Sequence, residues 1–371
     1  MKFLHTSDLH IGKRLNGVQL IEDQKYILSQ IIKIAEEEKA DAIVAAGDIY
    51  DKSTPAADYV PVLDDFINEA VKRNIPLLMI SGNHDSPERI EFASRLIEKS
   101  GVYISGKYNG EIRMYEIGGV EFYLLPYIRP SFARVYYPDE KIENTEDAVR
   151  AVLKDINPSK KSVIVSHQTV IASESELIRR DSESVSIGGS DAVSYTVFDK
   201  FAYAALGHIH SAQSVGREEV RYSGTPLKYS KSEAGDRKSV TIVEINDNGV
   251  SIKERELTPL RDLRVIKGEI DELLKHEVYS LGDTEDYIYA VLTDELQEMN
   301  YMDRVQSVYK NCLGIEIDNK RTSQDNDYTE AEEDKQPIEL FADFFKMQNN
   351  VDMSDEEIEI MEKFIKEALD E

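Results

Sequence analysis

The first hundred residues alternate short apolar runs with longer stretches in which apolar side chains recur every three or four positions. The short runs predict buried strands, and the longer stretches predict amphipathic helices. Strands that alternate with helices of this length are typical of βαβ units and of a largely parallel sheet. The predicted strands are Lys2–Thr6, Asp41–Ala46 and Pro76–Ser81, and the predicted helices are Gln19–Lys39, Ala56–Arg73 and Pro87–Lys99.

The pattern changes after about residue 110, where short apolar runs follow one another more closely. Gly118 and Gly119 separate two such runs and are typical of a two-residue hairpin. For residues 1–257 we therefore expect an α/β fold, a sandwich of two mixed β-sheets flanked by helices. The further strands are expected at Ile112–Ile117, Val120–Pro126, Ser162–Ser166, Tyr203–Leu206, Val220–Ser223, Ser239–Ile245 and Val250–Leu257.

The last third of the chain has three parts. Residues 258–320 continue a strand–helix–strand pattern, which predicts a small α+β domain. Residues 321–337 are polar, acidic and without periodicity, so we expect a linker. Residues 338–371 contain two amphipathic helical stretches, and Ser354 with Glu357 three positions later is a capping box before the second. The elements expected here are Arg264–Leu274, Ile288–Thr293, Met302–Val308, Ile338–Met347 and Asp355–Leu369.

Composition places the chain among soluble proteins. The hydrophobic class makes up 41% of the residues and charged residues 31%, which is enough apolar surface for a sizeable core. No apolar run approaches the roughly 18 residues of a membrane span, and the N-terminus turns polar too early for a signal peptide. Cys312 is the single cysteine, so an intramolecular disulfide is excluded. We expect a cytoplasmic protein without membrane contact.

The net charge of −27 is unevenly distributed. Residues 1–250 carry 30 Lys and Arg against 38 Asp and Glu, a net of −8, whereas residues 251–371 carry 14 against 33, a net of −19. A nucleic-acid-binding surface normally needs local positive charge. The charge therefore disfavours nucleic acid for the last third and decides little for the first two thirds.

Polar clusters follow several of the predicted strands. Five of the seven histidines fall in these clusters. In open α/β sheets, ligands bind beyond the carboxyl ends of strands, so we expect these side chains to meet. The clusters are Ser7-Asp8-Leu9-His10, Gly47-Asp48-Ile49-Tyr50-Asp51, Gly82-Asn83-His84-Asp85, Ser166-His167-Gln168 and Gly207-His208-Ile209-His210.

These carboxylates, imidazoles and one amide form a hard-to-borderline ligand set without thiolate, suited to manganese, iron, magnesium or zinc. A carboxylate can bridge two cations, and Asp48, which follows a glycine, is the expected bridge. His208 and His210 are separated by one residue and therefore point to the same side of an extended chain, where each can serve one ion. We assign Asp8, His10, Asp48 and His210 to one ion and Asp48, Asn83, His167 and His208 to the other.

The motifs DxH, GDxxD, GNHD, a single H and GHxH, in this order, resemble the calcineurin-like metallophosphoesterases. Four longer stretches resemble the SbcD family, the nuclease subunits of SbcC–SbcD DNA-repair complexes. Leu9 departs from that pattern, because SbcD proteins usually carry tryptophan there. The stretches are Leu4–Gly12, Ile187–Ala192, Tyr222–Tyr229 and Pro337–Phe345.

The resemblance implies a DNA nuclease that uses two divalent ions, Mn²⁺ with Mg²⁺ as an alternative. It implies exonuclease action on duplex ends and endonuclease action on single strands and hairpins, within an ATP-dependent complex that serves DNA repair, recombination and replication. His84 is expected to be the general acid or a stabiliser of transition-state charge. Asp51 is expected to orient the His84 ring, by analogy with carboxylate–histidine pairs of related phosphatases.

The implied partners are DNA, a second copy of the chain and an SbcC-type ATPase subunit. The homodimer is expected through Ala56–Arg73 and Pro87–Lys99, DNA capping through residues 258–320, and SbcC binding through residues 338–371. Candidate DNA-backbone contacts are Lys13, Arg14 and Lys228, although scattered basic residues are equally often plain solvated surface. The candidate partner-binding side chains are Leu340, Phe341, Phe344 and Phe345.

Two other functions compete with a nuclease. The first is another metallophosphoesterase, such as a phosphatase or a cyclic-nucleotide phosphodiesterase, which would need neither the small domain nor the C-terminal helices. The second is a scaffold that has lost its metals, which predicts broken ligand positions, whereas all seven positions carry ligand-type side chains.

Overall fold

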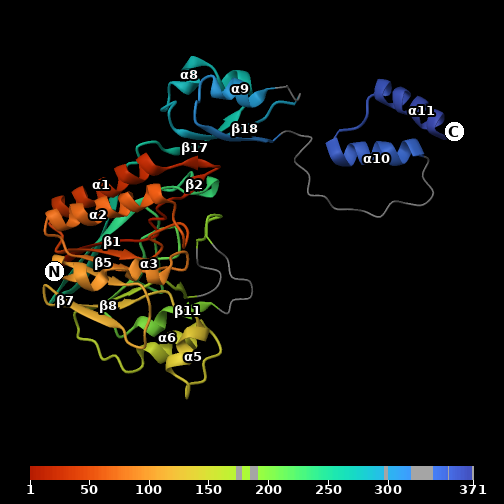
Figure 1. Cartoon of the computed structure of the whole chain (residues 1–371). Coiled ribbons are helices and arrows are strands. Elements are labelled where there is room, and N and C mark those ends of the chain that lie inside the picture. Colours follow the sequence, from red (N-terminus) through yellow and green to blue (C-terminus); the bar gives the residue numbers. More distant parts are fainter. Residues whose placement is uncertain (173–177, 184–190, 296–299, 319–336, 350, 370–371) are drawn as a thin grey trace. The chain divides into compact units, whose positions relative to one another are not determined.

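The computed structural model describes residues 1–371 except 173–177, 184–190, 296–299, 319–336, 350 and 370–371 (Figure 1). The chain divides into two units, Met1–Asp262 and Leu263–Glu371. The predicted linker falls almost wholly outside the described residues, as does most of the Ile187–Ala192 stretch.

The first unit contains a six-stranded sheet in the order β16-β15-β1-β4-β5-β6. The four strands from β1 to β6 run parallel, and β15 closes the other side by pairing antiparallel with β1 and β16. The apolar runs of β4 and β5 are buried on both faces, which is why they lack polar alternation. The bounds are β1 Lys2–Thr6, β4 Ala42–Ala46, β5 Leu77–Ile80, β6 Val102–Ser105, β15 Ser239–Asn246 and β16 Gly249–Glu256.

A second six-stranded sheet has the order β13-β14-β12-β9-β8-β7. Its centre is parallel, and its two edges are antiparallel pairs, one of them the hairpin turned by Gly118 and Gly119. The mixed sandwich predicted from the sequence is therefore confirmed. The bounds are β7 Arg113–Ile117, β8 Val120–Leu125, β9 Ser162–Ser166, β12 Tyr203–Leu206, β13 Gln213–Val215 and β14 Arg217–Tyr222.

The main core lies between the two sheets. Phe3 of β1 meets Phe122 of β8 and Tyr203 of β12 edge-on, with ring centroids 5.3 and 5.7 Å apart. Such pairs add about 0.5–1.5 kcal/mol each beyond the burial of their area. These contacts fix the two sheets against each other, and with them the strand ends that carry the polar clusters.

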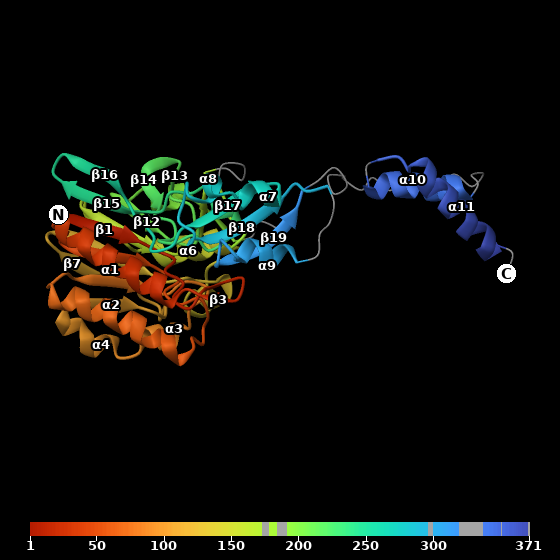
Figure 2. The same ribbon diagram turned by 90° about the horizontal axis from the view of Figure 1, so that it is seen from above.

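Helices cover the outer faces of the sandwich. Figures 1 and 2 show α1 (Ile21–Glu37) and α2 (Val60–Lys72) along the first sheet. Figure 1 shows α5 (Pro130–Tyr136) and α6 (Thr145–Leu153) below the second sheet. A second apolar cluster joins α6 to the second sheet. Two small strand pairs complete the unit, β2 (Arg14–Leu15) with β3 (Val18–Gln19) and β10 (Thr169–Ile171) with β11 (Ala192–Ser194).

The predicted continuous helix over Pro87–Lys99 is wrong. The segment forms α3 (Pro87–Glu91), a break, α4 (Ser94–Ile97) and a 3₁₀ turn, because Ala93 adopts a left-handed conformation with φ of 60°. A left-handed residue cannot continue a right-handed helix.

The second unit contains a parallel three-stranded sheet, β17-β18-β19, with short helices that share its apolar core. Its strands are β17 Leu263–Gly268, β18 Tyr287–Leu292 and β19 Cys312–Ile317, and its helices are α7 Ile270–Leu273, α8 His276–Tyr279 and α9 Tyr301–Gln306.

Two helices end the chain, α10 (Pro337–Asn349) and α11 (Asp355–Leu369). The capping box predicted for the second is confirmed, because the Glu357 backbone N–H donates to Ser354 Oγ at 3.3 Å and the Glu357 carboxylate accepts from the Ser354 backbone N–H at 2.8 Å. Among the helices of the described residues, none combines the length and the hydropathy required to cross a bilayer.

Candidate metal centre

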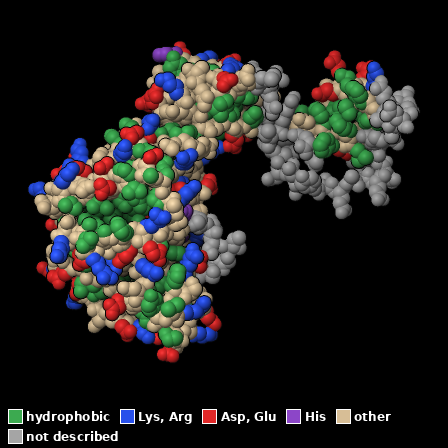
Figure 3. Space-filling view, in the orientation of Figure 1, with side chains coloured by type: hydrophobic (Ala, Val, Ile, Leu, Met, Phe, Trp, Pro, Cys, Tyr) green, Lys and Arg blue, Asp and Glu red, His purple; other side chains and the backbone are tan. Residues whose placement is uncertain are grey.

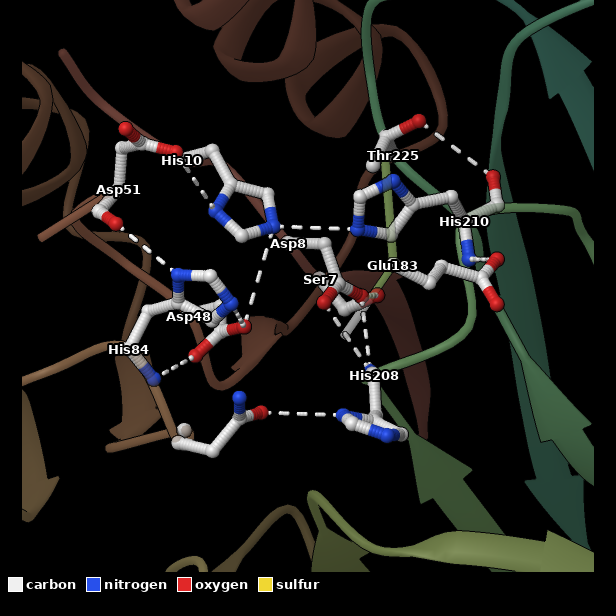
Figure 4. A network of polar contacts seen from close by, with 12 residues as sticks. Ser7, Asp8, His10, Asp48, Asp51, His84, Glu183, His208, His210 and Thr225 are labelled. Atoms are coloured by element: carbon white, nitrogen blue, oxygen red, sulfur yellow. Dashed lines mark hydrogen bonds and ion pairs between the residues drawn. The ribbon is translucent and has the colours of Figure 1, made fainter. Parts of the chain in front are cut away.

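The seven predicted ligands gather at one place, where the carboxyl ends of strands from both sheets meet. Figure 4 shows Asp8, His10, Asp48, His208 and His210 there. Loops after β1, β4 and β5 carry Asp8, His10, Asp48 and Asn83, and loops after β9 and β12 carry the three remaining histidines. Five of the seven are almost completely buried, and Asn83 and His208 are partly exposed. The sandwich thus brings together residues up to about 200 positions apart, as the sequence predicted.

The backbone at these strand ends is unusual. Asp8, His10, Asp48 and His208 all have positive φ, at 51°, 43°, 48° and 100°. Left-handed conformations in non-glycine residues cost on the order of 1 kcal/mol each and concentrate at functional sites. The rigid sheets hold the chain in these turns, which direct the side chains back toward the strand ends.

Gly82 and Gly207 lie so close to the candidate ligands that no side chain would fit at either position. A Cβ placed at Gly82 would overlap the carboxylate and backbone nitrogen of Asp48, and one at Gly207 would overlap the Ala46 carbonyl and the His167 ring. Glycine is required at both positions because the chain passes so close to the ligands.

The first group of ligands converges around two facing imidazoles. His10 Nε2 lies 3.1 Å from His210 Nε2. Asp8, His10 and His210 each offer a ligand atom within 4.8 Å of the others. Burial, which outweighs the nearby carboxylate of Asp48, holds the pKa of His10 well below its usual value. A neutral imidazole has a lone pair available for a metal ion.

The second group converges on the amide oxygen of Asn83. Asn83 Oδ1 lies 3.1 Å from His167 Nε2 and 3.0 Å from His208 Nδ1. His167 Nδ1 donates to the Ala46 carbonyl at 2.7 Å, so Nε2 is the nitrogen that could bind a metal ion once it has lost any proton of its own.

Asp48 lies between the two groups. Its Oδ2 is 3.8 Å from His10 Nε2 and 3.3 Å from His167 Nε2. Burial opposes its charge, but His167 and His10 beside it lower the pKa of Asp48 below its usual range, so the carboxylate is ionised. This is the position that a bridging carboxylate requires.

The chemistry of the donors fits divalent cations. Asp8 and Asp48 are buried carboxylates, and among the described residues no lysine or arginine forms an ion pair with either. Buried charges must be compensated, and burial together with the nearby charge of Asp48 raises the pKa of Asp8. Two cations held by oxygen and imidazole ligands would supply the missing positive charge.

His84 lies at the edge of the centre, with 27% of its side chain exposed and its Nε2 4.0 Å from Asp48 Oδ2. Asp51 does contact its ring, but through the backbone carbonyl, which accepts from His84 Nδ1 at 3.0 Å. The Asp51 carboxylate instead lies 3.0 Å from Lys13 Nζ and 3.7 Å from His10 Nδ1. The expected carboxylate–histidine pair is therefore wrong in detail, because the turn after β4 directs the Asp51 side chain toward His10.

Asp85 is a structural residue whose role the sequence did not reveal. Its buried carboxylate accepts from the backbone N–H groups of Ile49, Tyr50 and Gly82 at 2.8–3.0 Å. It therefore ties the loop of Asp48 to the loop of Asn83. The sequence shows Asp85 as the last residue of the GNHD motif. The motif does not show which backbone N–H groups the folded chain brings to its carboxylate.

The candidate DNA contacts differ in their surroundings. Arg14 is exposed on β2, and Lys13 is partly exposed beside Asp51. Lys228 is mostly buried, donates to the Ala234 carbonyl at 2.8 Å and lies 2.8 Å from an Asp262 oxygen, so a phosphate would have to compete with these partners. On α10, Leu340 and Phe344 are 37% and 53% exposed, and the Phe341 and Phe344 rings are 6.3 Å apart.

Two protein-family models match parts of this chain. The family model described as calcineurin-like phosphoesterase matches residues 1–212, and the SbcD_C model, described as type 5 capsule protein repressor C-terminal domain, matches residues 259–349. Similar solved structures include an archaeal phosphodiesterase (13% identity, 69% of this chain and 100% of that chain, TM-score 0.30). Another is TT1561 of Thermus thermophilus, with 14% identity over 68% of this chain and 98% of that chain and a TM-score of 0.39. A third is a dimetal phosphatase from Danio rerio, with 12% identity over 69% of this chain and 96% of that chain and a TM-score of 0.39.

The first family model covers more than half of the chain, and the structure gathers the metal-binding motifs of that family at one site. The chain therefore belongs to the calcineurin-like phosphoesterase family, whose members are metal-dependent phosphoesterases.

Proposed function

We propose that this chain is a two-metal DNA nuclease, the nuclease subunit of an SbcC–SbcD-type ATP-dependent complex. It would act as an exonuclease on duplex ends and as an endonuclease on single strands and hairpins, in DNA end processing. The observation that carries the proposal is the SbcD_C match over residues 259–349, which follows a phosphoesterase domain with all seven ligand positions filled. A stand-alone phosphatase needs no such second region.

Asp8, His10, Asp48 and His210 would hold one ion, and Asn83, His167 and His208 would hold the other together with Asp48. When bound, two divalent ions, most simply Mn²⁺ with Mg²⁺ as an alternative, would polarise the phosphodiester and supply a hydroxide for in-line attack. Asp48 would keep the two sites at a fixed separation.

His84 would protonate the leaving oxygen or stabilise the negative charge that develops on it. A carbonyl only accepts, so the contact with Asp51 O places a proton on His84 Nδ1 and fixes the ring. Nε2 then faces the centre from its exposed edge. A second proton at Nε2 can pass to the departing DNA oxygen or stabilise charge in the transition state.

The proposed partners use other surfaces. Lys13 and Arg14 would contact the DNA backbone, and the small domain near residues 258–320 would cap the DNA. The C-terminal segment, residues 338–371, would bind the ATPase subunit through the apolar side of α10, where Phe344 is 53% exposed. Exposed aromatic side chains of this kind mark interaction surfaces.

The proposed homodimer would use α2 and the broken helix after it. Hydrophobic side chains gather over this region in Figure 3, and Phe92 and Leu96 are 81% and 78% exposed. Sedimentation of Leu96→Glu tests this surface: we expect a monomer, whereas an unchanged dimer would place the interface elsewhere.

The nuclease proposal is tested by incubating the chain with Mn²⁺ and three substrates: a labelled DNA hairpin, a single strand and a small phosphomonoester. We expect cleavage of both DNA substrates, lost on chelation by EDTA and restored by added Mn²⁺. Rapid hydrolysis of the phosphomonoester without DNA cleavage would move the assignment to a phosphatase.

A further inference from the structure

His210 is held by a segment that the sequence did not connect with it. Residues 178–183, which we call the strap, lie outside every helix and strand and carry Ser182 and Glu183. Ser182 Oγ is 2.6 Å from His210 Nδ1, and the Glu183 carboxylate accepts from the His210 backbone N–H at 2.8 Å. Figure 4 shows the Glu183 side chain reaching that backbone nitrogen.

The contact at Ser182 continues to a buried acid. Ser182 Oγ is also 2.6 Å from Glu233 Oε1, and Glu233 is fully buried. The other oxygen of Glu233 accepts from Lys238 Nζ at 2.6 Å. Lys238 is itself almost completely buried, so this contact is a buried ion pair in which Glu233 is the anion.

The directions of these hydrogen bonds follow from the donor count. A serine hydroxyl has one hydrogen to give, and an ionised carboxylate can only accept. Ser182 therefore donates to Glu233 and must accept from His210 Nδ1. A histidine that ligates a metal ion carries one ring proton, and in His210 that proton then sits on Nδ1. That leaves the lone pair on Nε2, the nitrogen that faces His10 across 3.1 Å.

We propose that Ser182 is a positioning residue for the metal centre, which fixes His210 as the ligand-competent tautomer through a chain of hydrogen bonds ending at Glu233. Partners of this kind orient ligand histidines in metal sites and raise their basicity. The inference rests on the two-metal site proposed above.

The strap has its own anchors, which supply a control. Arg180 forms a two-pronged ion pair with Asp236, and Ser232 Oγ accepts from the Asp181 backbone N–H at 3.1 Å. Neither contact touches the His210 ring. Ser232→Ala therefore loosens the strap without removing the hydroxyl at His210.

The test is calorimetric titration of Mn²⁺ into the full chain as the native form, Ser182→Ala, Ser182→Thr and Ser232→Ala. We expect Ser182→Ala to weaken one of the two sites by about 10–100-fold. Ser182→Thr keeps the hydroxyl and should bind both ions like the native chain, as should Ser232→Ala. Thermal melting of the metal-free forms checks that each variant is folded.

Native-like binding of both ions by Ser182→Ala would overturn the proposal. Equal weakening in Ser232→Ala would also overturn it, because the strap would then matter only as a folded segment. A native chain that binds two Mn²⁺ ions but leaves DNA intact would contradict the nuclease assignment alone, since the role of Ser182 is read from the isotherm.

Discussion

The backbone carbonyl and the carboxylate of Asp51 contact different histidines of the candidate site. Its carbonyl holds His84, and its carboxylate faces Lys13 and His10. Asp51→Asn keeps the carbonyl that holds His84, so turnover at saturating Mn²⁺ should stay close to that of the native chain. Loss of general-acid catalysis would instead lower turnover by roughly 100-fold. The lost charge beside His10 should lower Mn²⁺ affinity by roughly 10-fold. Steady-state DNA cleavage at varied Mn²⁺ measures both quantities.

Asp58→Asn is the matched control, because Asp58 is an exposed aspartate in the turn before α2. A large fall in turnover for Asp51→Asn at saturating Mn²⁺ would show that the carboxylate itself orients His84.

His167 gives a prediction about protons. Burial disfavours its charge, but the carboxylates of Asp48 and Asp8 together with the Ala46 carbonyl outweigh burial and raise the pKa of His167 to about 9. In the metal-free chain at about pH 7.5 the ring therefore carries an extra proton, which metal binding must expel. We expect the native chain to release about one proton more than His167→Asn on binding Mn²⁺, and this difference to vanish as the pH rises above about 9.

Calorimetry in buffers of different ionisation enthalpy measures this release. Equal proton release by the two forms near neutral pH would contradict the assignment of His167 as a ligand.

At the scale of elements, the backbone at the strand ends shapes the candidate site, and Gly82 is one of the positions with the least room for a side chain. A side chain there would force Asp48 to move, so Gly82→Ala should abolish binding of at least one ion and destabilise the fold by about 1–3 kcal/mol. Gly235 has no neighbouring atom near its missing side chain and no left-handed backbone, so Gly235→Ala is the control.

Thermal melting and Mn²⁺ stoichiometry give the readout for both glycine variants. Two bound ions in a fully stable Gly82→Ala chain would mean that the loops after β4 and β5 are looser than described.

The sequence predicted the elements of the site well because each ligand lies next to a strong signal. The runs before Asp8, Asp48 and His208 are apolar and short, so the ends of β1, β4 and β12 could be located within a residue. Polar clusters at such ends converge in any parallel sheet. The meeting of these candidate ligands at one place could therefore be predicted from the sequence.

The features that escaped prediction depend on contacts between distant segments. The helix break at Ala93 is not marked by a glycine or proline in the sequence, and packing sets the left-handed conformation of Ala93. Ser182 and Glu233 are ordinary polar residues in loops, and only the fold brings both to His210. The orientation of the Asp51 carboxylate could likewise not be predicted from the spacing of residues in the motif, because that spacing does not determine a side-chain rotamer.

At the scale of the whole molecule, the proposed metal site and the proposed partner surface lie in different parts of the chain. The seven candidate metal ligands lie in the unit of residues 1–262, and the proposed ATPase-binding surface lies on α10 and α11. A chain ending at residue 336 should keep Mn²⁺ binding and cleavage of single-stranded DNA but lose binding to the SbcC-type subunit. Co-purification with that subunit, with Phe344→Asp as a point variant, measures the loss.

Retained binding by the shortened chain would place the ATPase contact on the phosphoesterase unit or the small domain. Lost Mn²⁺ binding would instead show that the C-terminal helices support the metal centre.

The most direct test of the proposed mechanism is His84→Gln in the full chain, assayed for both Mn²⁺ stoichiometry and cleavage of a labelled DNA hairpin. Glutamine fills a similar space but cannot donate a titratable proton. We expect two bound Mn²⁺ ions, as in the native chain, with hairpin cleavage reduced by about 100-fold or more. Cleavage at the native rate with two ions bound would contradict the role of His84 and, with it, the proposed mechanism.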